Sequence, residues 1–80
     1  MNTHQATKKR IIDLCKIKQI TPNGLSYISG VSQSTIKSIL NDESQNPGIV
    51  TIKKLCDGFD ISLTEFFNTE YFKNLEQEIK

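Results

Sequence analysis

Four polar side chains in the stretch 33–41 are the residues of this sequence best suited to recognition chemistry. They are Gln33, Ser34, Lys37 and Ser38, which bring an amide, two hydroxyls and an ammonium group. Such groups donate hydrogen bonds to base edges and phosphates, whereas a carboxylate would repel the phosphate backbone. A helix face that is only solvated would usually carry one or two acidic residues. We therefore expect these side chains to contact nucleic acid, and a plain polar surface is the alternative.

The sequence contains no set of residues typical of catalysis or metal binding. His4 is the only histidine and lies near the N-terminus, where we expect no role for it. Cys15 and Cys56 lie in separate apolar stretches, and this spacing does not match a zinc site. No nucleophile, base and orienting group stand out together. We therefore expect no enzyme activity, no metal and no cofactor.

The two cysteines are expected to be free thiols packed as small hydrophobic residues. A redox-responsive regulator, with Cys15 and Cys56 as its switch, remains the alternative.

Length and charge restrict the function further. The 80 residues form one small domain, and no apolar run approaches the roughly 18 residues that cross a membrane. The polar and then basic N-terminus lacks the apolar segment of a secretory signal, which predicts a cytoplasmic protein. Residues 1–41 carry six Lys and Arg against one Asp, whereas residues 42–80 carry four Lys against eight acidic residues. This asymmetry predicts a positive face on the first half, in which Lys8, Lys9 and Arg10 either steer toward DNA or form a solvated helix start.

Apolar spacing predicts an all-α domain. Helices are expected over about 5–18, 22–29, 33–41 and 49–59, followed by a short helix that contains Leu63, Phe66 and Phe67. The first helix is expected to be capped by Thr3 or Thr7, and the later helices by Thr21, Ser32 and Ser62. Ile28 and Ile49 are expected to point inward. Residues 42–48 form a polar loop.

The tail, residues 69–79, can add one or two amphipathic turns with Phe72, Leu75 and Ile79 on one side. Because the core is already complete by Phe67, we favour a dimer contact for this stripe over a fold-back onto the same chain. The sequence thus divides into a domain over 1–68 and a possible dimerisation segment over 69–80.

The two short helices in residues 22–41 have the pattern of a helix-turn-helix. Leu25 and Ile36 are placed to hold the two helices together, and Val31 and Ile39 to anchor them in the core. Gly30 permits the tight turn between the helices.

On these residues the sequence resembles the lambda-repressor-like, Cro/CI-type (XRE) helix-turn-helix domains. The resemblance runs from about Arg10 to Phe67 and is carried by residues 25–36, by Asn46-Pro47 and by residues 52–67. It implies a compact five-helix bundle with a central helix-turn-helix, to which the tail can add a short sixth helix. In the family, the third helix enters the major groove.

The resemblance also implies roles for single residues. Gln33 and Ser34 would reach base edges, with Gln33 suited to adenine, and Lys37 and Ser38 would reach a base or a phosphate. The implied contacts to phosphates are Pro22, Asn23, Ser32, Thr35, Asn41 and Gly48. A homodimer would read two half-sites about one DNA turn apart.

The sequence departs from the family pattern directly after Asn41. The family often has a glycine and a basic residue there, whereas this chain has Asp42 and Glu43. Two carboxylates near phosphate weaken binding unless the loop turns them away. Gly58 stands where the family often has alanine, at a cost of about 1 kcal/mol in helix preference.

The predicted function is therefore a sequence-specific, double-stranded-DNA-binding transcriptional regulator, with repression as the default from family analogy. No small-molecule ligand and no membrane association are expected. An antitoxin-like or adaptor protein that binds other proteins on the same scaffold is the alternative.

Overall fold

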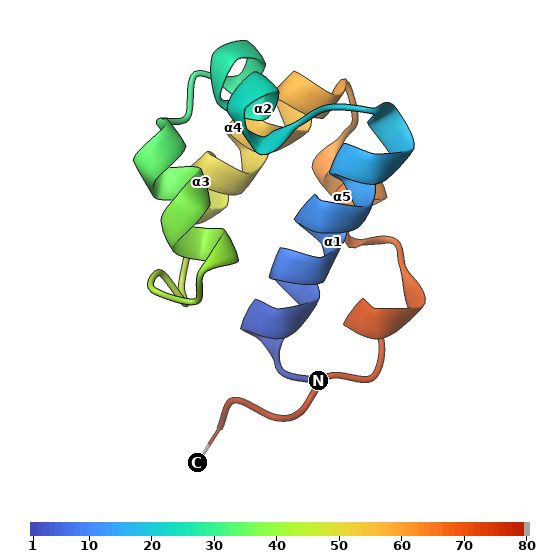
Figure 1. Cartoon of the computed structure of the whole chain (residues 1–80). Coiled ribbons are helices and arrows are strands. Elements are labelled where there is room, and N and C mark those ends of the chain that lie inside the picture. Colours follow the sequence, from blue (N-terminus) through green and yellow to red (C-terminus); the bar gives the residue numbers. More distant parts are fainter. Residues whose placement is uncertain (80) are drawn as a thin grey trace.

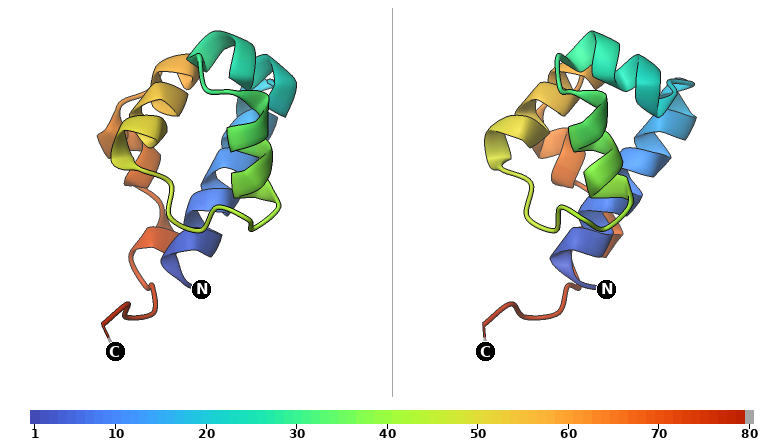
Figure 2. Two further views of the ribbon diagram at one scale, coloured as in Figure 1. Left: turned by 90° about the vertical axis from the view of Figure 1, so that its left-hand side faces the viewer. Right: turned by 60° about the vertical axis from the view of Figure 1, so that its left-hand side comes forward.

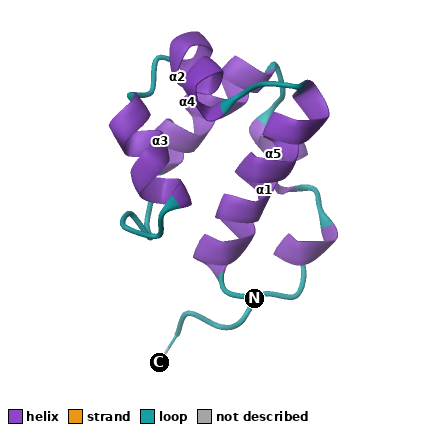
Figure 3. Cartoon of the chain, viewed as in Figure 1, coloured by secondary structure: helices purple, strands orange, loops and turns teal. Residues whose placement is uncertain are grey.

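The computed structural model describes residues 1–79 and is all-helical across them (Figures 1 and 3). Its elements are α1 (Thr3–Lys18), α2 (Pro22–Ser29), α3 (Gln33–Leu40), α4 (Ile49–Phe59), α5 (Leu63–Phe67) and a 3-10 turn, η1 (Glu70–Phe72). The predicted five-helix architecture is confirmed. None of the described helices is long and apolar enough to span a membrane.

The start of α1 differs from the prediction, since neither Thr3 nor Thr7 caps it. Asn2 caps the helix instead: its side chain accepts from the Gln5 amide, and the Gln5 side chain accepts from the Asn2 amide, both at 2.8 Å. Thr7 is buried, and its hydroxyl donates to the Thr3 carbonyl at 2.9 Å. A reciprocal pair satisfies two free amides at once, which a lone threonine cannot do.

The other helix ends follow the sequence signals. Thr21 accepts from the Gly24 amide at 3.0 Å, and Ser62 and Glu65 form a capping box. Gly30 ends α2 and Asp60 ends α4 with left-handed backbone, at φ 75° and φ 60° respectively. The predicted ends of α2 and α4 are therefore confirmed.

A single core joins the five helices. Its buried members are Ile11, Leu14, Leu25, Val31, Ile36, Ile39, Ile52, Leu55, Cys56, Phe59 and Phe66. The predictions for Ile28 and Ile49 were wrong, because their exposed fractions are 49% and 58%. Ile49 is the first residue of α4, beside the open loop, and Ile28 lies at the margin of the α2–α4 contact.

Gly58 explains how closely α2 and α4 approach. A Cβ atom on Gly58 would lie 3.0 Å from the Ser29 Cβ and 3.2 Å from the Ile28 Cγ1. The Ser29 Cα would also lie 3.2 Å from it, so the backbone of α2 itself occupies the space. The low helix preference of glycine at this position is offset by the close packing it permits.

The tail does not form the predicted amphipathic stripe. Phe72 lies in η1 and packs edge-on against Phe67, with ring centroids 5.1 Å apart. Leu75 is half-buried and Ile79 is 86% exposed, so the three predicted residues do not share one face. Phe72 packs against the chain's own core, as the fold-back alternative has it, and a dimer contact through the rest of the tail stays a prediction. Glu76 also bonds back to the Met1 carbonyl at 3.2 Å.

The start of α1, the end of α3 and the tail lie at the same end of the molecule (Figure 2). The loop of residues 42–48 crosses this end between α3 and α4, close to the N-terminus.

Candidate nucleic-acid interface

The turn between α2 and α3 is held by a small hydrogen-bonded network. The Ser26 hydroxyl donates to the Val31 carbonyl at 2.6 Å, and the Val31 amide donates to the Ser29 hydroxyl at 3.2 Å. The Gly30 amide donates to the Ser26 carbonyl at 3.1 Å. These bonds fix the direction in which α3 leaves α2. The hydrogen bond of the Ser26 hydroxyl was not predicted from the sequence.

Burial divides α3 into two faces, as expected from helical spacing. Ile36 and Ile39 are buried, and they meet Leu25 and Val31 in the core as predicted. Gln33, Ser34 and Lys37 are exposed on the opposite side, and Ser38 is half-buried. All the hydrogen-bond donors that the sequence suggested for base contact, apart from Ser38, therefore face solvent.

The start of α2 and the outward side of α3 together line a surface groove of about 620 Å³. The predicted contact residues in its lining are Pro22, Asn23, Gln33, Ser34, Lys37 and Asn41. Ile36 and Leu40 supply its apolar part. The groove does not include the other predicted residues, which are Ser32, Thr35, Ser38 and Gly48. The structure thus brings predicted contact residues from the start of α2 and from α3 together in one groove. The other four predicted residues lie outside its lining.

Three hydroxyl groups gather at the start of α3. The Ser32 hydroxyl accepts from the Thr35 amide at 3.2 Å and lies 2.8 Å from the Thr35 Oγ1. It also lies 3.2 Å from the Ser34 Oγ. Each hydroxyl has one proton and two lone pairs, so the cluster keeps donor capacity for a ligand while capping the helix.

Two helix starts present amides that the described chain does not use. At α2, Thr21 bonds the Gly24 amide and leaves the Asn23 amide open. At α4, Gly48 occupies the cap position without a side-chain hydrogen bond. Such amides, together with the helix dipole, favour an anion such as phosphate.

The two acidic residues after α3 behave differently. Asp42 is turned toward α1, where its carboxylate lies 2.8 Å from His4 Nε2 and 3.1 Å from Lys8 Nζ. The hydrogen bond from His4, followed by that from Lys8, lowers the pKa of Asp42. Glu43 is exposed. One of the two carboxylates that raised doubt about phosphate binding is therefore neutralised within the chain.

The expectation that His4 has no role was wrong. Its side chain is only 9% exposed and holds Asp42 at the end of α3. The two residues are 38 positions apart, and no local pattern in the sequence connects them.

The basic residues at positions 8–10 all have partners within the chain, and Lys9 stays exposed while Lys8 and Arg10 are half-buried. Arg10 donates through Nε to the Phe66 carbonyl and through a terminal nitrogen to the Glu65 carbonyl, both at 2.7 Å. Lys9 pairs with Asp13 at 3.3 Å and lies over the Tyr71 ring. These cations hold α1 against α5, η1 and the loop.

Both cysteines are free, Cys56 buried and Cys15 half-buried. Burial raises the pKa of each thiol above its ordinary value. A raised pKa leaves little of the reactive thiolate near neutral pH, which argues against the redox-switch alternative.

Comparison with known proteins identifies the family. The model of the Cro/C1-type HTH DNA-binding domain matches residues 10–71, most of the chain. The chain belongs to this family. A Cro/C1-type domain is a DNA-binding regulator, and all ten predicted contact residues lie inside the matched range.

A solved structure has a similar fold. The crystal structure of the prophage Lp1 protein 11 has a TM-score of 0.80 to this Cro/C1-type domain and is 26% identical to it. The match covers 94% of this chain and 100% of that chain. No curated protein sequence matches the chain.

Proposed function

We propose that this domain reads the major groove of double-stranded DNA with the outward face of α3 and acts as a repressor. The observation that carries the proposal is the groove of about 620 Å³ shared by the start of α2 and by α3. Gln33 and Lys37 lie in it, exposed and with no hydrogen bond to another side chain of the described residues. Side chains without protein partners are free to bond a base.

Base selection comes from four side chains. The Gln33 amide matches the donor and acceptor pair of adenine, and the Lys37 ammonium matches guanine acceptors or a phosphate. Ser34 and Ser38 add hydroxyls that either donate or accept. A good bidentate pair contributes about 1–3 kcal/mol of discrimination against the wrong base.

Phosphate contacts set the position of α3. Asn23, beside Pro22, and Gly48 offer helix-start amides, while Ser32 and Thr35 offer hydroxyls and Asn41 offers an amide. These contacts supply affinity without sequence preference, and binding should therefore weaken as salt rises.

Repression needs only that the domain occupies its site. A net charge of +1 gives a single copy weak electrostatic attraction, and pairing two copies on adjacent half-sites would offset this weakness. We therefore propose that a homodimer binds two half-sites about 34 Å apart.

The test is selection from a randomised duplex DNA pool at low and moderate salt. Wild type is compared with the double variant Gln33→Ala, Lys37→Ala. The matched control, Lys54→Ala with Gln77→Ala, removes the same residue types from exposed positions outside the groove. Wild type and the control should enrich the same short palindrome, and the α3 double variant should lose at least about tenfold in affinity for it.

Circular dichroism of each variant establishes that the fold persists. Equal enrichment by the α3 double variant would contradict the assignment of α3 as the reading helix. Absence of any enriched sequence, even at low salt, would contradict the proposal and favour the antitoxin-like or adaptor alternative.

A further inference from the structure

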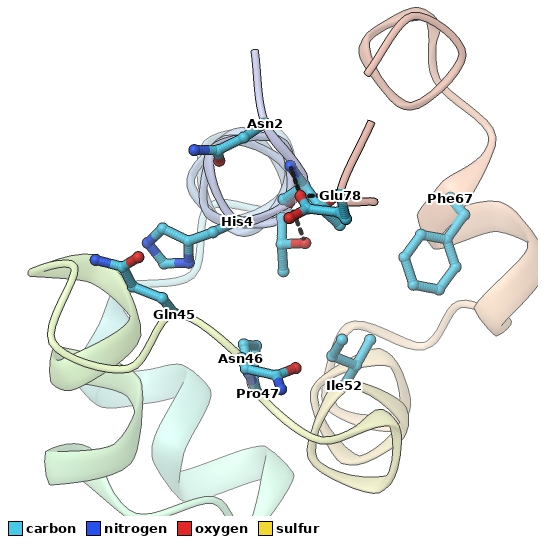
Figure 4. Close-up of a pocket in the computed structure, with 10 residues that line it drawn as sticks. Asn2, His4, Gln45, Asn46, Pro47, Ile52, Phe67 and Glu78 are labelled. Carbon is cyan, nitrogen blue, oxygen red and sulfur yellow. Dashed lines mark hydrogen bonds between the residues drawn. The ribbon is translucent and has the colours of Figure 1, made fainter. Parts of the chain in front are cut away.

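A second concave site lies at the opposite end of α3 from the turn, between α1, the 42–48 loop, α4, α5 and the tail (Figure 4). Its volume is about 480 Å³, within the range of small-molecule sites. It shares no residue with the groove proposed to contact DNA. The DNA-binding role therefore does not account for it.

His4 supplies the unexplained feature of this cavity. Its side chain is more than nine-tenths buried, at 9% exposure, and its Nδ1 has no hydrogen-bond partner among the described residues. Figure 4 shows the ring of His4 reaching from α1 toward Gln45 at the edge of the cavity. A buried polar atom without a partner costs free energy, so Nδ1 needs a hydrogen-bond partner, and a molecule bound in the cavity would supply one.

The other ring nitrogen determines which chemistry Nδ1 offers. Nε2 lies 2.8 Å from the Asp42 carboxylate, which only accepts, so the ring proton resides on Nε2. In the neutral ring Nδ1 is then an acceptor, and it requires a donor such as a hydroxyl or an ammonium group.

The remaining walls of the cavity combine a second acceptor with an apolar surface. Glu78 from the tail accepts through Oε2 from the Thr3 hydroxyl at 2.9 Å, and it borders the cavity near His4. Pro47, Ile52 and Phe67 line the apolar side (Figure 4). Glu78 would repel a ligand that carries a carboxylate. A ligand that carries a hydrogen-bond donor on an apolar group suits both the acceptor side and the apolar side of the cavity.

We propose that this cavity binds a small molecule that places a hydroxyl or ammonium group on His4 Nδ1 and an apolar group against Ile52 and Phe67. This proposal departs from the expectation, drawn from the sequence, that the chain takes no small-molecule ligand.

The site also borders the end of α3. His4 holds Asp42, whose backbone is left-handed at φ 64°, directly after the helix. The next two residues, Glu43 and Ser44, donate their amides to the Ser38 carbonyl at 2.9 and 3.0 Å. A ligand on His4 would therefore adjust the segment that ends α3, and a resulting change in DNA affinity rests on the function proposed above.

The test measures binding to the free, full-length chain, so it does not depend on DNA. Amide chemical shifts are recorded by NMR while benzyl alcohol and benzylamine are added. Toluene has the same ring without a donor, and benzoate has a carboxylate in its place. The two donor probes should shift the amides of Asn46, Ile52 and Phe67, with dissociation constants at least several-fold lower than those of toluene and benzoate.

Two variants and one matched control make the test specific. In His4→Gln, the side-chain amide nitrogen can take the place of Nε2 on Asp42, but the Nδ1 acceptor is lost, so benzyl alcohol should bind no better than toluene. Asn46→Phe fills the cavity, and it should abolish the shifts at Ile52. The matched variant Asn74→Phe places the same ring at an exposed position outside the cavity, and it should leave binding unchanged.

Donor probes that shift no cavity amide of wild type would overturn the proposal. So would undiminished benzyl alcohol binding to a folded His4→Gln or Asn46→Phe variant. If His4→Gln unfolds, the comparison of Asn46→Phe with Asn74→Phe decides the question. Titration of DNA affinity with benzyl alcohol is separate, and loss of DNA binding in every condition would contradict the proposed function without affecting the ligand site.

Discussion

The outward face of α3 and the first turns of α1 carry similar side chains and use them in opposite ways. Lys37 and Gln33 on α3 are exposed and have no side-chain partners among the described residues. Lys8 and Arg10 on α1 are bonded to the Asp42 carboxylate and to backbone carbonyls of α5. A basic residue is therefore available to DNA only where the fold leaves it without an acceptor of its own.

The difference shows why charge counts alone mislead here. The first half of the chain holds six of the ten basic residues, but three of them, Lys8, Lys9 and Arg10, have partners inside the domain. The sequence left two interpretations for these three residues, steering toward DNA or a solvated helix start, and the structure shows that each has a partner within the chain. The proposed site on α3 combines amide and hydroxyl groups with a single lysine.

The largest effect on stability is expected when Arg10 is removed. Arg10→Ala deletes two charged hydrogen bonds to α5, and we expect the free energy of unfolding to fall by about 2–3 kcal/mol. Lys37→Ala should change it by no more than about 0.5 kcal/mol, because that side chain is exposed. Urea unfolding followed by circular dichroism measures both.

Lys16→Ala serves as the control, since Lys16 is exposed on the same helix. If Arg10→Ala and Lys16→Ala lower the unfolding free energy equally, Arg10 does not have the structural role that distinguishes α1 from α3.

A smaller effect on stability is expected at Gly58, which packs closely against α2. Gly58→Ala gains about 1 kcal/mol of helix preference, but the new Cβ would lie 3.2 Å from the Ser29 Cα. Overpacking of this kind costs about 1–3 kcal/mol, so we expect a net loss of about 1 kcal/mol. Thermal unfolding measures the loss. Gly48→Ala, where a Cβ meets open space, is the control, and a more stable Gly58→Ala protein would contradict the close α2–α4 packing.

Asp42 should produce a weaker, pH-dependent effect. Because its pKa is lowered in the fold, its carboxylate stabilises the folded state above the ordinary pKa, and this contribution is lost as pH falls through the lowered value. Asp42→Asn should therefore flatten the fall in the urea midpoint at acid pH. The neighbouring variant Glu43→Gln should retain the wild-type profile, and identical profiles for both variants would refute the special role of Asp42.

Modification of the cysteines is expected to have the smallest effect on DNA binding. Burial raises the pKa of both thiols, so the folded protein should react with Ellman's reagent far more slowly than the urea-unfolded protein at about pH 8. The same treatment should leave DNA affinity unchanged. Rapid labelling of the folded protein with loss of DNA binding would instead support a redox switch.

Much of the fold was predictable because its signals are local. Thr21-Pro22 and Gly30 mark the ends of α2, and the Ser62–Glu65 pair marks the start of α5; each acts within one helical turn. The exposed face of α3 was also predictable, since helical spacing alone separates Gln33 and Lys37 from the buried Ile36.

The errors occurred where a contact joins distant parts of the chain. His4 and Asp42 are 38 positions apart, and Arg10 meets Phe66 across 56. Phe72 was expected on a dimer surface, and only the packing of the tail onto Phe67 shows that the chain's own core uses it.

The sequence by itself determined the helices, the helix-turn-helix and the residue types on the outward face of α3, because hydrophobic spacing and capping act over one or two helical turns. The tertiary structure alone decided which charges stay free and where a cavity forms behind His4. These features depend on which side chains and carbonyls meet once the helices pack, and burial then determines whether a polar atom has a partner.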